Sequence, residues 1–161
     1  MSLLAKKRNV IFLGQSVIYP GNLIYKSLDH ISNSKKIETP VFEETQLGMS
    51  IGLSLNGFLP ICCYPRFDFF ILAMNQAVNH LDKLNIISNG LFKPKVIVRI
   101  LVGNKKPLNA GEQHTQNHSK ALKSMIKNCN IFEINRANQV IPFYKKAIMS
   151  SRSSFMIEKS V

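Results

Sequence analysis

The residue best placed for chemistry in this 161-residue chain is Glu43. It opens a segment, 43–56, whose apolar spacing predicts a helix that ends at Gly57. A carboxylate on a rigid helix end can donate or accept one proton at a fixed position, which is a general acid or base role. The plainer interpretation is that Glu43 and Glu44 only complement the positive end of the helix dipole.

Histidine and cysteine side chains offer other kinds of chemistry. His114 and His118 are four residues apart and could bind a metal from one face of a helix. A zinc site needs further ligands, and none lies nearby in the sequence, so we expect no metal site. The cysteines have no Cys-x-x-Cys spacing and are expected to be buried, reduced thiols; they are Cys62, Cys63 and Cys129.

Two glycines, Gly48 and Gly52, lie inside the predicted helix. Each costs about 1 kcal/mol relative to alanine in a helix interior, so another backbone is expected to approach there. The approaching element is either the domain's own sheet, which the sequence alone favours, or a second subunit.

Apolar runs typical of buried strands alternate with helical patterns along the chain. The patterns predict strands at 9–13, 58–64, 95–101, 131–134 and 155–158, and helices at 23–31, 43–56, 68–88, 117–126 and 137–149. The inward faces of two helices are expected to hold Leu47, Ile51 and Leu55 in the first, and Ile71, Met74, Val78 and Leu81 in the second. The segment from Val102 to Thr115 is a long loop without a structure signal, and such loops are often functional.

This alternation predicts an α/β protein with three layers, αβα, around a mostly parallel central sheet. Such sheets bind ligands at the carboxyl ends of their strands. The length favours one domain, residues 1–161, without an internal linker.

Several motifs come in one order along the chain and together resemble a known domain. They are Glu38 to Glu43 (ETPVFE), Gly57 to Pro60 (GFLP), Phe67 to Phe69 with Gln76 to Asn79, and Gly111 to Gln116 (GEQHTQ). This order resembles the N-terminal, pyrimidine-binding domain of the beta subunit of 2-oxo acid dehydrogenases, of the pyruvate and branched-chain type. The same domain type occurs in transketolases. The resemblance extends from Asn9 to about Glu158.

The resemblance implies a thiamine diphosphate-binding fold and specific roles for single residues. Glu43 matches the glutamate that hydrogen-bonds a ring nitrogen of the cofactor's pyrimidine, and Phe69 matches the aromatic residue that packs on that ring. His114 matches a loop histidine close to the reacting substrate. Gln15 and Pro65 are also placed at the cofactor, and Gly48 and Gly52 at a subunit interface.

The chain also departs from the family pattern. Gly14-Gln15-Ser16 stands where the family has Gly-Glu-Glu, so a neutral amide replaces an acid. Phe42 stands where a small serine normally opens the helix, and the loop is basic at Lys105 and Lys106. These differences leave the pyrimidine contact intact but argue against full catalytic competence.

No magnesium motif of the Gly-Asp-Gly…Asn type occurs in the sequence, nor does a transketolase-type C-terminal domain. We therefore expect a pyrimidine-binding subunit of a two-component enzyme that acts on a 2-oxo acid or a ketose. A separate diphosphate-binding subunit would hold Mg²⁺, the chain would be inactive alone, and a homo- or hetero-oligomer is implied. The alternative is a non-catalytic interaction protein that retains the fold and a dimer surface.

The net charge of +12 raises nucleic acid as a partner. The basic residues are scattered, without a run of five, so an acidic partner subunit or solubility explains the charge better. A basic nucleic-acid module remains a third hypothesis. No apolar run approaches the roughly 20 residues of a membrane-spanning helix, and no signal peptide is readable, so a cytoplasmic location is expected.

Overall fold

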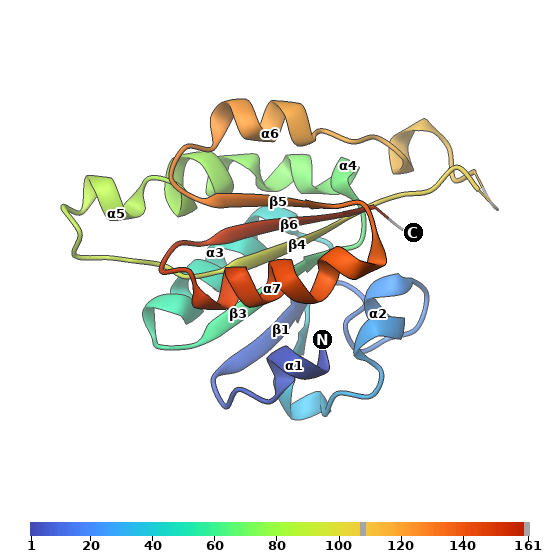
Figure 1. Cartoon of the computed structure of the whole chain (residues 1–161), viewed down its shortest axis with the longest axis horizontal. Helices are drawn as coiled ribbons and strands as arrows, with labels where there is room; N and C mark the ends of the chain where they lie inside the picture. Colours follow the sequence, from blue (N-terminus) through green and yellow to red (C-terminus); the bar gives the residue numbers. More distant parts are fainter. Residues whose placement is uncertain (107–108, 160–161) are drawn as a thin grey trace.

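Six strands form one sheet in the computed structural model, which describes residues 1–106 and 109–159 (Figure 1). Every pair is parallel, and the strand order is β2-β1-β3-β4-β6-β5. The strands are β1 Val10–Gly14, β2 Lys36–Glu38, β3 Leu59–Tyr64, β4 Ile97–Val102, β5 Asn130–Ile134 and β6 Ser154–Lys159. Residues 107 and 108 of the predicted loop, and 160 and 161 of the predicted domain, lie outside the described residues.

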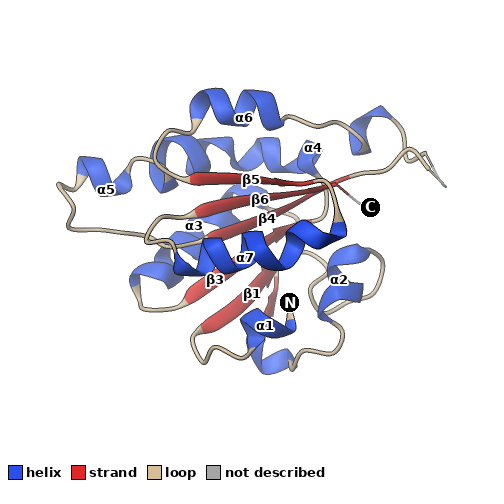
Figure 2. Cartoon of the chain, viewed as in Figure 1, coloured by secondary structure: helices blue, strands red, loops and turns tan. Residues whose placement is uncertain are grey.

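Helices cover both faces of the sheet (Figure 2), so the predicted three-layer α/β fold is confirmed. The α-helices are α1 Ser2–Ala5, α2 Leu23–Leu28, α3 Glu43–Leu55, α4 Phe67–Phe70, α5 Leu84–Ile87, α6 Ser119–Met125 and α7 Val140–Met149. Helical segments of other types are the 3₁₀ turns η1 Asn33–Lys35, η2 Ile71–Ala73, η4 Glu112–His114 and η5 Ala137–Gln139, and the π-helical segment η3 Gln76–Leu81.

Two hydrophobic layers result from the alternation of side chains along the strands. In β3, Cys62 and Tyr64 belong to the layer under α3, α4 and α6, whereas Ile61 and Cys63 belong to the layer under α1, α2 and α7. All residues of β3 and β4 are buried, which explains why these strands read as continuous apolar runs.

One charged pair lies inside the second layer. The guanidinium of Arg99 on β4 donates from Nε and Nη2 to the carboxylate of Glu158 on β6, at 3.1 and 2.9 Å. Its Nη1 donates to Ser27 Oγ on α2 at 2.6 Å, and the hydroxyl of Tyr144 on α7 donates to Glu158 at 2.6 Å. Buried charges need this kind of complete pairing, and here it links two strands to the two helices above them.

The predicted helix 68–88 is helical over most of its length but is not one regular α-helix. It is divided into α4, η2, a π-helical turn η3 and α5. Its buried face consists of Phe67, Phe70, Ala73, Ala77 and Leu81, one residue earlier than predicted along most of its length. Ile71, predicted to face inward, is 47% exposed because the larger aromatic ring of Phe70 fills the core position.

Further differences concern short or terminal features. Leu55, at the end of α3, is 42% exposed, whereas Leu47 and Ile51 of the same predicted face are buried. The sequence did not predict β2 or α1, which are only three and four residues long. Among the described residues, no helix combines the length and apolar character needed to cross a membrane.

Candidate functional site

Glu43 begins α3 beside the carboxyl end of β1 and is only 4% exposed. Its Oε1 accepts a hydrogen bond of 3.2 Å from the side-chain amide of Gln15. Its backbone carbonyl accepts a bond of 2.9 Å from the hydroxyl of Tyr64, the last residue of β3. The first turn of α3 is therefore attached to two neighbouring strand ends.

Gln15 reaches Glu43 because β1 ends in a glycine. Gly14 has a φ of +144°, and a Cβ atom there would lie 2.3 Å from the carbonyl oxygen of Cys63 on β3. A side chain at this position would therefore meet both backbone strain and a steric clash. The absence of a side chain lets the end of β1 pass close to β3.

Glu38 holds the loop that carries Gln15, a role that the sequence did not reveal. Its carboxylate accepts hydrogen bonds from the backbone N–H groups of Ser16 at 2.5 Å and Ile18 at 2.7 Å. Ser16 has a φ of +56°, an uncommon value for a residue other than glycine. The acidic residue of the Glu-Thr-Pro motif thus positions the loop next to the candidate site.

Gln46 attaches the next turn of α3 to the sheet and was also missed. Its side-chain amide donates to the carbonyl of Cys63 at 2.9 Å and its oxygen accepts from Thr39 Oγ1 at 3.2 Å. A polar residue three positions after Glu43, beside Leu47, was the available signal, because that spacing places it on the buried helix face.

Phe69 and His114, which lie far apart in the sequence, pack together in the structure. Their rings meet edge to face, with centroids 5.3 Å apart. The loop after β4 can fold back onto α4 because Gly103 lies under it: a Cβ atom at Gly103 would be 1.8 Å from the carbonyl oxygen of His114. The backbone N–H of Gln116 also donates to Asp68 at 3.2 Å.

The candidate residues thus form two groups at one edge of the sheet. Glu43 and Gln15 make one group, and Phe69 and His114 make the other. Pro65 follows Tyr64 at the end of β3, is half-buried, and its carbonyl accepts a hydrogen bond of 2.7 Å from Arg66. Within residues 1–106 and 109–159, no hydrogen bond or ring contact joins the two groups directly.

The two helix glycines are not explained by close packing within the chain. A Cβ atom at Gly48 would meet only the side chain of Gln76, at 3.7 Å, and none of the described atoms lies within 4 Å at Gly52. The expectation that the backbone of the domain's own sheet approaches these glycines is therefore wrong for both, because Gly48 meets only a side chain and Gly52 meets none of the described atoms. Phe42 occupies the N-cap position of α3 without a side-chain hydrogen bond, as expected for the loss of a serine cap.

The cysteine thiols are poor candidates for nucleophiles. All three are free. Burial raises the pKa of Cys63 and of Cys129 to about 12 and also raises that of Cys62, so the reactive thiolate is disfavoured at neutral pH.

The side chain of His118 packs against an aromatic ring. Its ring packs edge to face on Phe67, at 5.5 Å between centroids. No group of three or more His, Cys, Asp or Glu side chains that could hold a metal was found in the described part of the chain.

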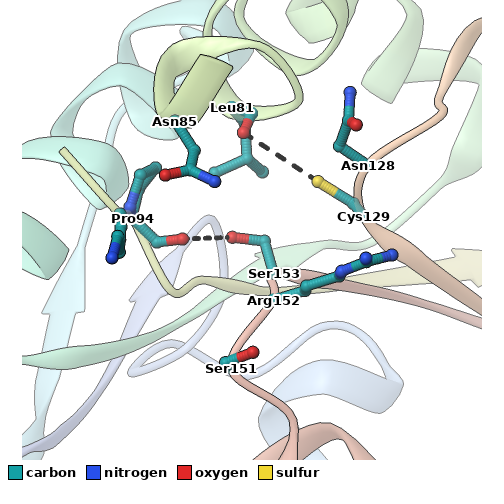
Figure 3. A pocket seen from close by; sticks show the side chains of 9 residues that line it. Leu81, Asn85, Pro94, Asn128, Cys129, Ser151, Arg152 and Ser153 are labelled. Carbon is teal, nitrogen blue, oxygen red and sulfur yellow. Dashed lines mark hydrogen bonds between the residues drawn. The ribbon is translucent and has the colours of Figure 1, made fainter. Parts of the chain in front are cut away.

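Two cavities lie at opposite edges of the sheet. One, of about 590 Å³, lies at the carboxyl end of β4, the edge that carries Glu43 and His114. The other, of about 330 Å³, lies where β4, β5 and β6 begin, and Figure 3 shows Cys129 directed toward Leu81 and Ser153 toward Pro94 in its lining. The second cavity is therefore separate from the candidate site.

Comparison with known proteins relates the chain to one group of enzymes. No family model matches it. It is 27% identical over 161 residues to the pyruvate dehydrogenase E1 component subunit beta of Cyanidium caldarium, covering 96% of this chain and 47% of that protein. It is 29% identical over 119 residues to the same subunit of Gracilaria tenuistipitata var. liui, covering 72% of this chain and 35% of that protein. The chain thus spans about half or less of the length of these relatives.

Relatives named as chloroplastic, from Arabidopsis thaliana, and mitochondrial, from Saccharomyces cerevisiae, also match. The cytoplasmic location therefore stays a prediction.

Two solved structures with the same fold are transketolase chains. The chain of a split gene transketolase, described as an inactive beta4 tetramer, has a TM-score of 0.70 at 18% identity, covering 97% of this chain and 47% of that one. Transketolase from Campylobacter jejuni has a TM-score of 0.71 at 14% identity, covering 96% of this chain and 23% of that one. Homologues of this chain are thus pyruvate dehydrogenase E1 beta subunits, and its α/β fold is that of transketolase chains, consistent with a transketolase-like pyrimidine-binding domain.

Proposed function

We propose that this chain, as a single domain, is the pyrimidine-binding part of a thiamine diphosphate enzyme of the 2-oxo acid dehydrogenase or transketolase type. The proposal rests on the burial of the Glu43 carboxylate and on its hydrogen-bond partner. It is nearly buried at the carboxyl edge of a parallel sheet, and the one hydrogen bond to it within the described residues comes from a neutral amide. A buried carboxylate without a cationic partner is costly and is typically retained for function.

The residues present fit an aminopyrimidine ring. Glu43 Oε2 has no hydrogen-bond partner among the described residues, so it is available to a ring nitrogen. Phe69 offers an aromatic surface, and His114 packs against its ring. Gln15 and Pro65 complete the proposed lining. The residues that sequence resemblance assigned to the cofactor thus supply an acid, an aromatic ring and neutral polar groups.

Each residue then has a definite task. When bound, thiamine diphosphate supplies the carbanion chemistry that cleaves the bond next to a carbonyl group. Glu43 would hold or accept a proton at the pyrimidine nitrogen, a role that suits a carboxylate fixed on a helix end. His114 would donate hydrogen bonds or a proton to the reacting substrate, a 2-oxo acid or a ketose.

A second subunit would complete the site. No Gly-Asp-Gly…Asn motif occurs in this sequence, so we assign the diphosphate and Mg²⁺ to a separate diphosphate-binding subunit. The structural neighbour described as an inactive beta4 tetramer of a split gene transketolase supports inactivity of a chain of this kind alone.

The α3 surface is proposed as part of the subunit interface. Gly52 is exposed, and no described atom lies within 4 Å of the point where a Cβ atom would stand. Met49 and Leu55 on the same helix are exposed apolar residues. Small residues allow another backbone to approach closely, and exposed apolar side chains favour a protein partner. This surface supports the proposal of an oligomer, either homomeric or with the diphosphate-binding subunit.

The test is a titration of thiamine diphosphate with Mg²⁺ into the chain alone and into the chain mixed with a candidate diphosphate-binding subunit. We expect binding and turnover only in the mixture. Micromolar affinity of the isolated chain would contradict the shared site.

Two observations favour a non-catalytic interaction protein instead. Gln15 pairs with Glu43 where the family pattern has an acid, and Phe42 leaves α3 without a serine cap. This alternative predicts complex formation without turnover. Reconstitution with the partner subunit therefore separates the two functions.

A further inference from the structure

We infer that the amino edge of the sheet, where the parallel strands begin, binds single-stranded nucleic acid. All strands run in the same direction, so the segments that precede them lie along this one edge (Figure 1). The candidate site lies at the opposite edge, beside the carboxyl ends of β1 and β3. The inference therefore goes beyond the proposed function.

The parallel sheet brings together basic residues that are scattered in the sequence. The segments that precede β1 to β6 contain no aspartate or glutamate; they are 6–9, 32–35, 55–58, 93–96, 126–129 and 150–153. Five of these segments contain cations, which are Lys6, Lys7, Arg8, Lys35, Lys93, Lys95, Lys127 and Arg152. Within the described residues, none of these cations forms an ion pair. The fold thus produces a basic surface that the order of residues in the chain does not show.

One acidic residue that contacts this edge, Asp82, does not neutralise it. Its carboxylate is buried and accepts from Lys83 Nζ and from the backbone N–H groups of residues 127–129. The charge of Asp82 is therefore already balanced by Lys83. The exposed cations on either side, Lys127 and Arg152, keep their charge for a ligand.

Two neighbouring cavities lie along the amino edge. The cavity of about 330 Å³ (Figure 3) is lined by Lys93 and Arg152, and a third cavity, of about 280 Å³, is lined by Lys7, Lys93 and Lys95. Lys93 lines both, and neither lining contains a carboxylate. A row of hollows with cations suits a chain of phosphates better than a single small anion.

The cations of the third cavity are held close to one another. Lys95 is half-buried, and its Nζ donates to the carbonyl of Ile148 at the end of α7. Burial and, next, the charge of Lys7 lower the pKa of Lys95. Like charges held together without a counter-charge favour an anionic ligand.

Exposed aromatic rings lie beside these cations. Phe58 is 40% exposed and lines the third cavity, and Phe92, which directly precedes Lys93, is 45% exposed. The side chain of Asn9 donates to the carbonyl of Gly57 at 3.1 Å and so holds the turn that presents Phe58. Rings between phosphate-binding cations are typical of surfaces on which unpaired bases stack. This combination favours a single strand over an acidic protein, which has no bases to stack, and over a membrane, whose flat surface would not enter the cavities.

The experiment is fluorescence anisotropy of labelled oligothymidylate and oligouridylate of equal length, titrated with the full chain at several salt concentrations. We expect saturable binding with a slope of log Kobs against log salt of about −2 to −3, the value for roughly three to four phosphate contacts to a single strand. The two oligonucleotides distinguish DNA from RNA, because only RNA has the 2′-hydroxyl group. Duplex DNA, polyglutamate and phosphatidylserine vesicles serve as competitors.

A double variant, Lys93→Gln with Arg152→Gln, should weaken binding at least about tenfold and reduce the slope by about 1.4, the share of two contacts. The matched control is Lys120→Gln with Lys145→Gln, which removes the same charge from exposed positions on α6 and α7. It should change the affinity by less than about twofold, because distant charges are screened by salt.

Phe58→Leu keeps an apolar side chain but removes the ring, and should weaken binding at least about fivefold. Lys7→Gln keeps the test available if a variant at position 58 or 93 does not fold. Equal losses in the two double variants or an unchanged affinity of Phe58→Leu would overturn the inference. So would tighter binding of duplex DNA, polyglutamate or vesicles, or no saturable binding at about 50 mM salt.

Failure of this site and failure of the proposed function are distinguishable. In the reconstituted complex, the double variant at positions 93 and 152 should keep the kcat of the parent, since both residues lie at the edge opposite Glu43. Glu43→Gln should in turn leave oligonucleotide binding unchanged.

Discussion

Gln15 donates a hydrogen bond of 3.2 Å to the buried carboxylate of Glu43. The carboxylate proposed for proton transfer is thus paired with a neutral amide, which can support its charge but cannot exchange a proton with it. The geometry of this pair leads to the first two predictions.

Replacing Glu43 should remove activity without unfolding the chain. In the complex reconstituted with its diphosphate-binding subunit, Glu43→Gln should lower kcat by at least about 100-fold, since an amide cannot transfer the proton. The control is Glu44→Gln, an exposed neighbour in the same helical turn whose carboxylate only accepts from Asn75 at 2.9 Å. Steady-state rates and circular dichroism of both variants check the result; an active Glu43 variant would remove the catalytic assignment.

Gln15→Glu should make stability depend on pH. Two carboxyl groups at this distance disfavour double ionisation, so the pKa of the introduced carboxyl is expected to be raised in the folded state. A raised pKa means that the folded form binds the proton more tightly, so stability is retained near pH 4 and falls as the pH rises through the raised pKa. We expect a loss of about 1 kcal/mol at pH 8 relative to the parent chain.

Urea unfolding of the Gln15→Glu variant and the parent at both pH values measures this difference. Gln15→Ala serves as the control, because it removes the hydrogen bond without adding an acid. Identical pH profiles for the Glu and Ala variants would show that the two side chains at 15 and 43 do not interact in solution.

Asp82 should determine the acid limit of stability. It is buried, and its carboxylate accepts from the backbone N–H groups of Lys127, Asn128 and Cys129. Burial opposes its charge, but the hydrogen bonds from Lys83 and from these three backbone groups hold the pKa of Asp82 at about 2.

A lowered pKa gives stability that is present above the unfolded-state value of 3.8 and is lost as the pH falls through about 2. Asp82→Asn should therefore cost about 2 kcal/mol at pH 7 and much less below pH 2. Urea unfolding across this range checks it. Equal losses in the free energy of unfolding at pH 7 and below pH 2 would mean that the shape of the side chain at position 82, and not its charge, matters.

Two substitutions at Gly52 distinguish the effect of helix propensity on stability from the effect of side-chain size on oligomer formation. Since a Cβ atom added at Gly52 would have no described atom within 4 Å, Gly52→Ala should stabilise the isolated chain by about 0.5–1 kcal/mol. Gly52→Leu should instead weaken oligomer formation, because overpacking a close contact costs about 1–3 kcal/mol. Light scattering measures the mass of each variant; an unchanged mass for Gly52→Leu would exclude Gly52 from the interface.

The parts of the fold that the sequence predicted are those with strong local signals. Strands β3 and β4 are buried on both faces and therefore appear as unbroken apolar runs. In contrast, β2 has three residues, Lys36, Ile37 and Glu38, and it is a strand only because it pairs with β1. In the segment from Phe67 to Met74 every residue except Asp68 is apolar, so its periodicity could not show which face is inward.

For the site, the sequence identified residues that could do chemistry but missed those that position them. Phe69 and His114 were predicted to serve one site and do pack together. Glu38 and Gln46 looked like ordinary polar residues, because their partners are backbone groups 17 to 22 positions away in the sequence. Contacts of that kind exist only after the strands have paired.

The Arg99–Glu158 pair has a consequence for how the sheet assembles. Both residues sit opposite apolar neighbours in adjoining strands, with Arg99 beside Met156 and Leu101 beside Glu158. A shift of β6 by one residue would turn Glu158 to the other face of the sheet. The guanidinium of Arg99 would then be buried among apolar side chains without its ion-pair partner. The pair therefore favours the native register of β4 and β6, because a shift of one residue in either direction would be far more costly.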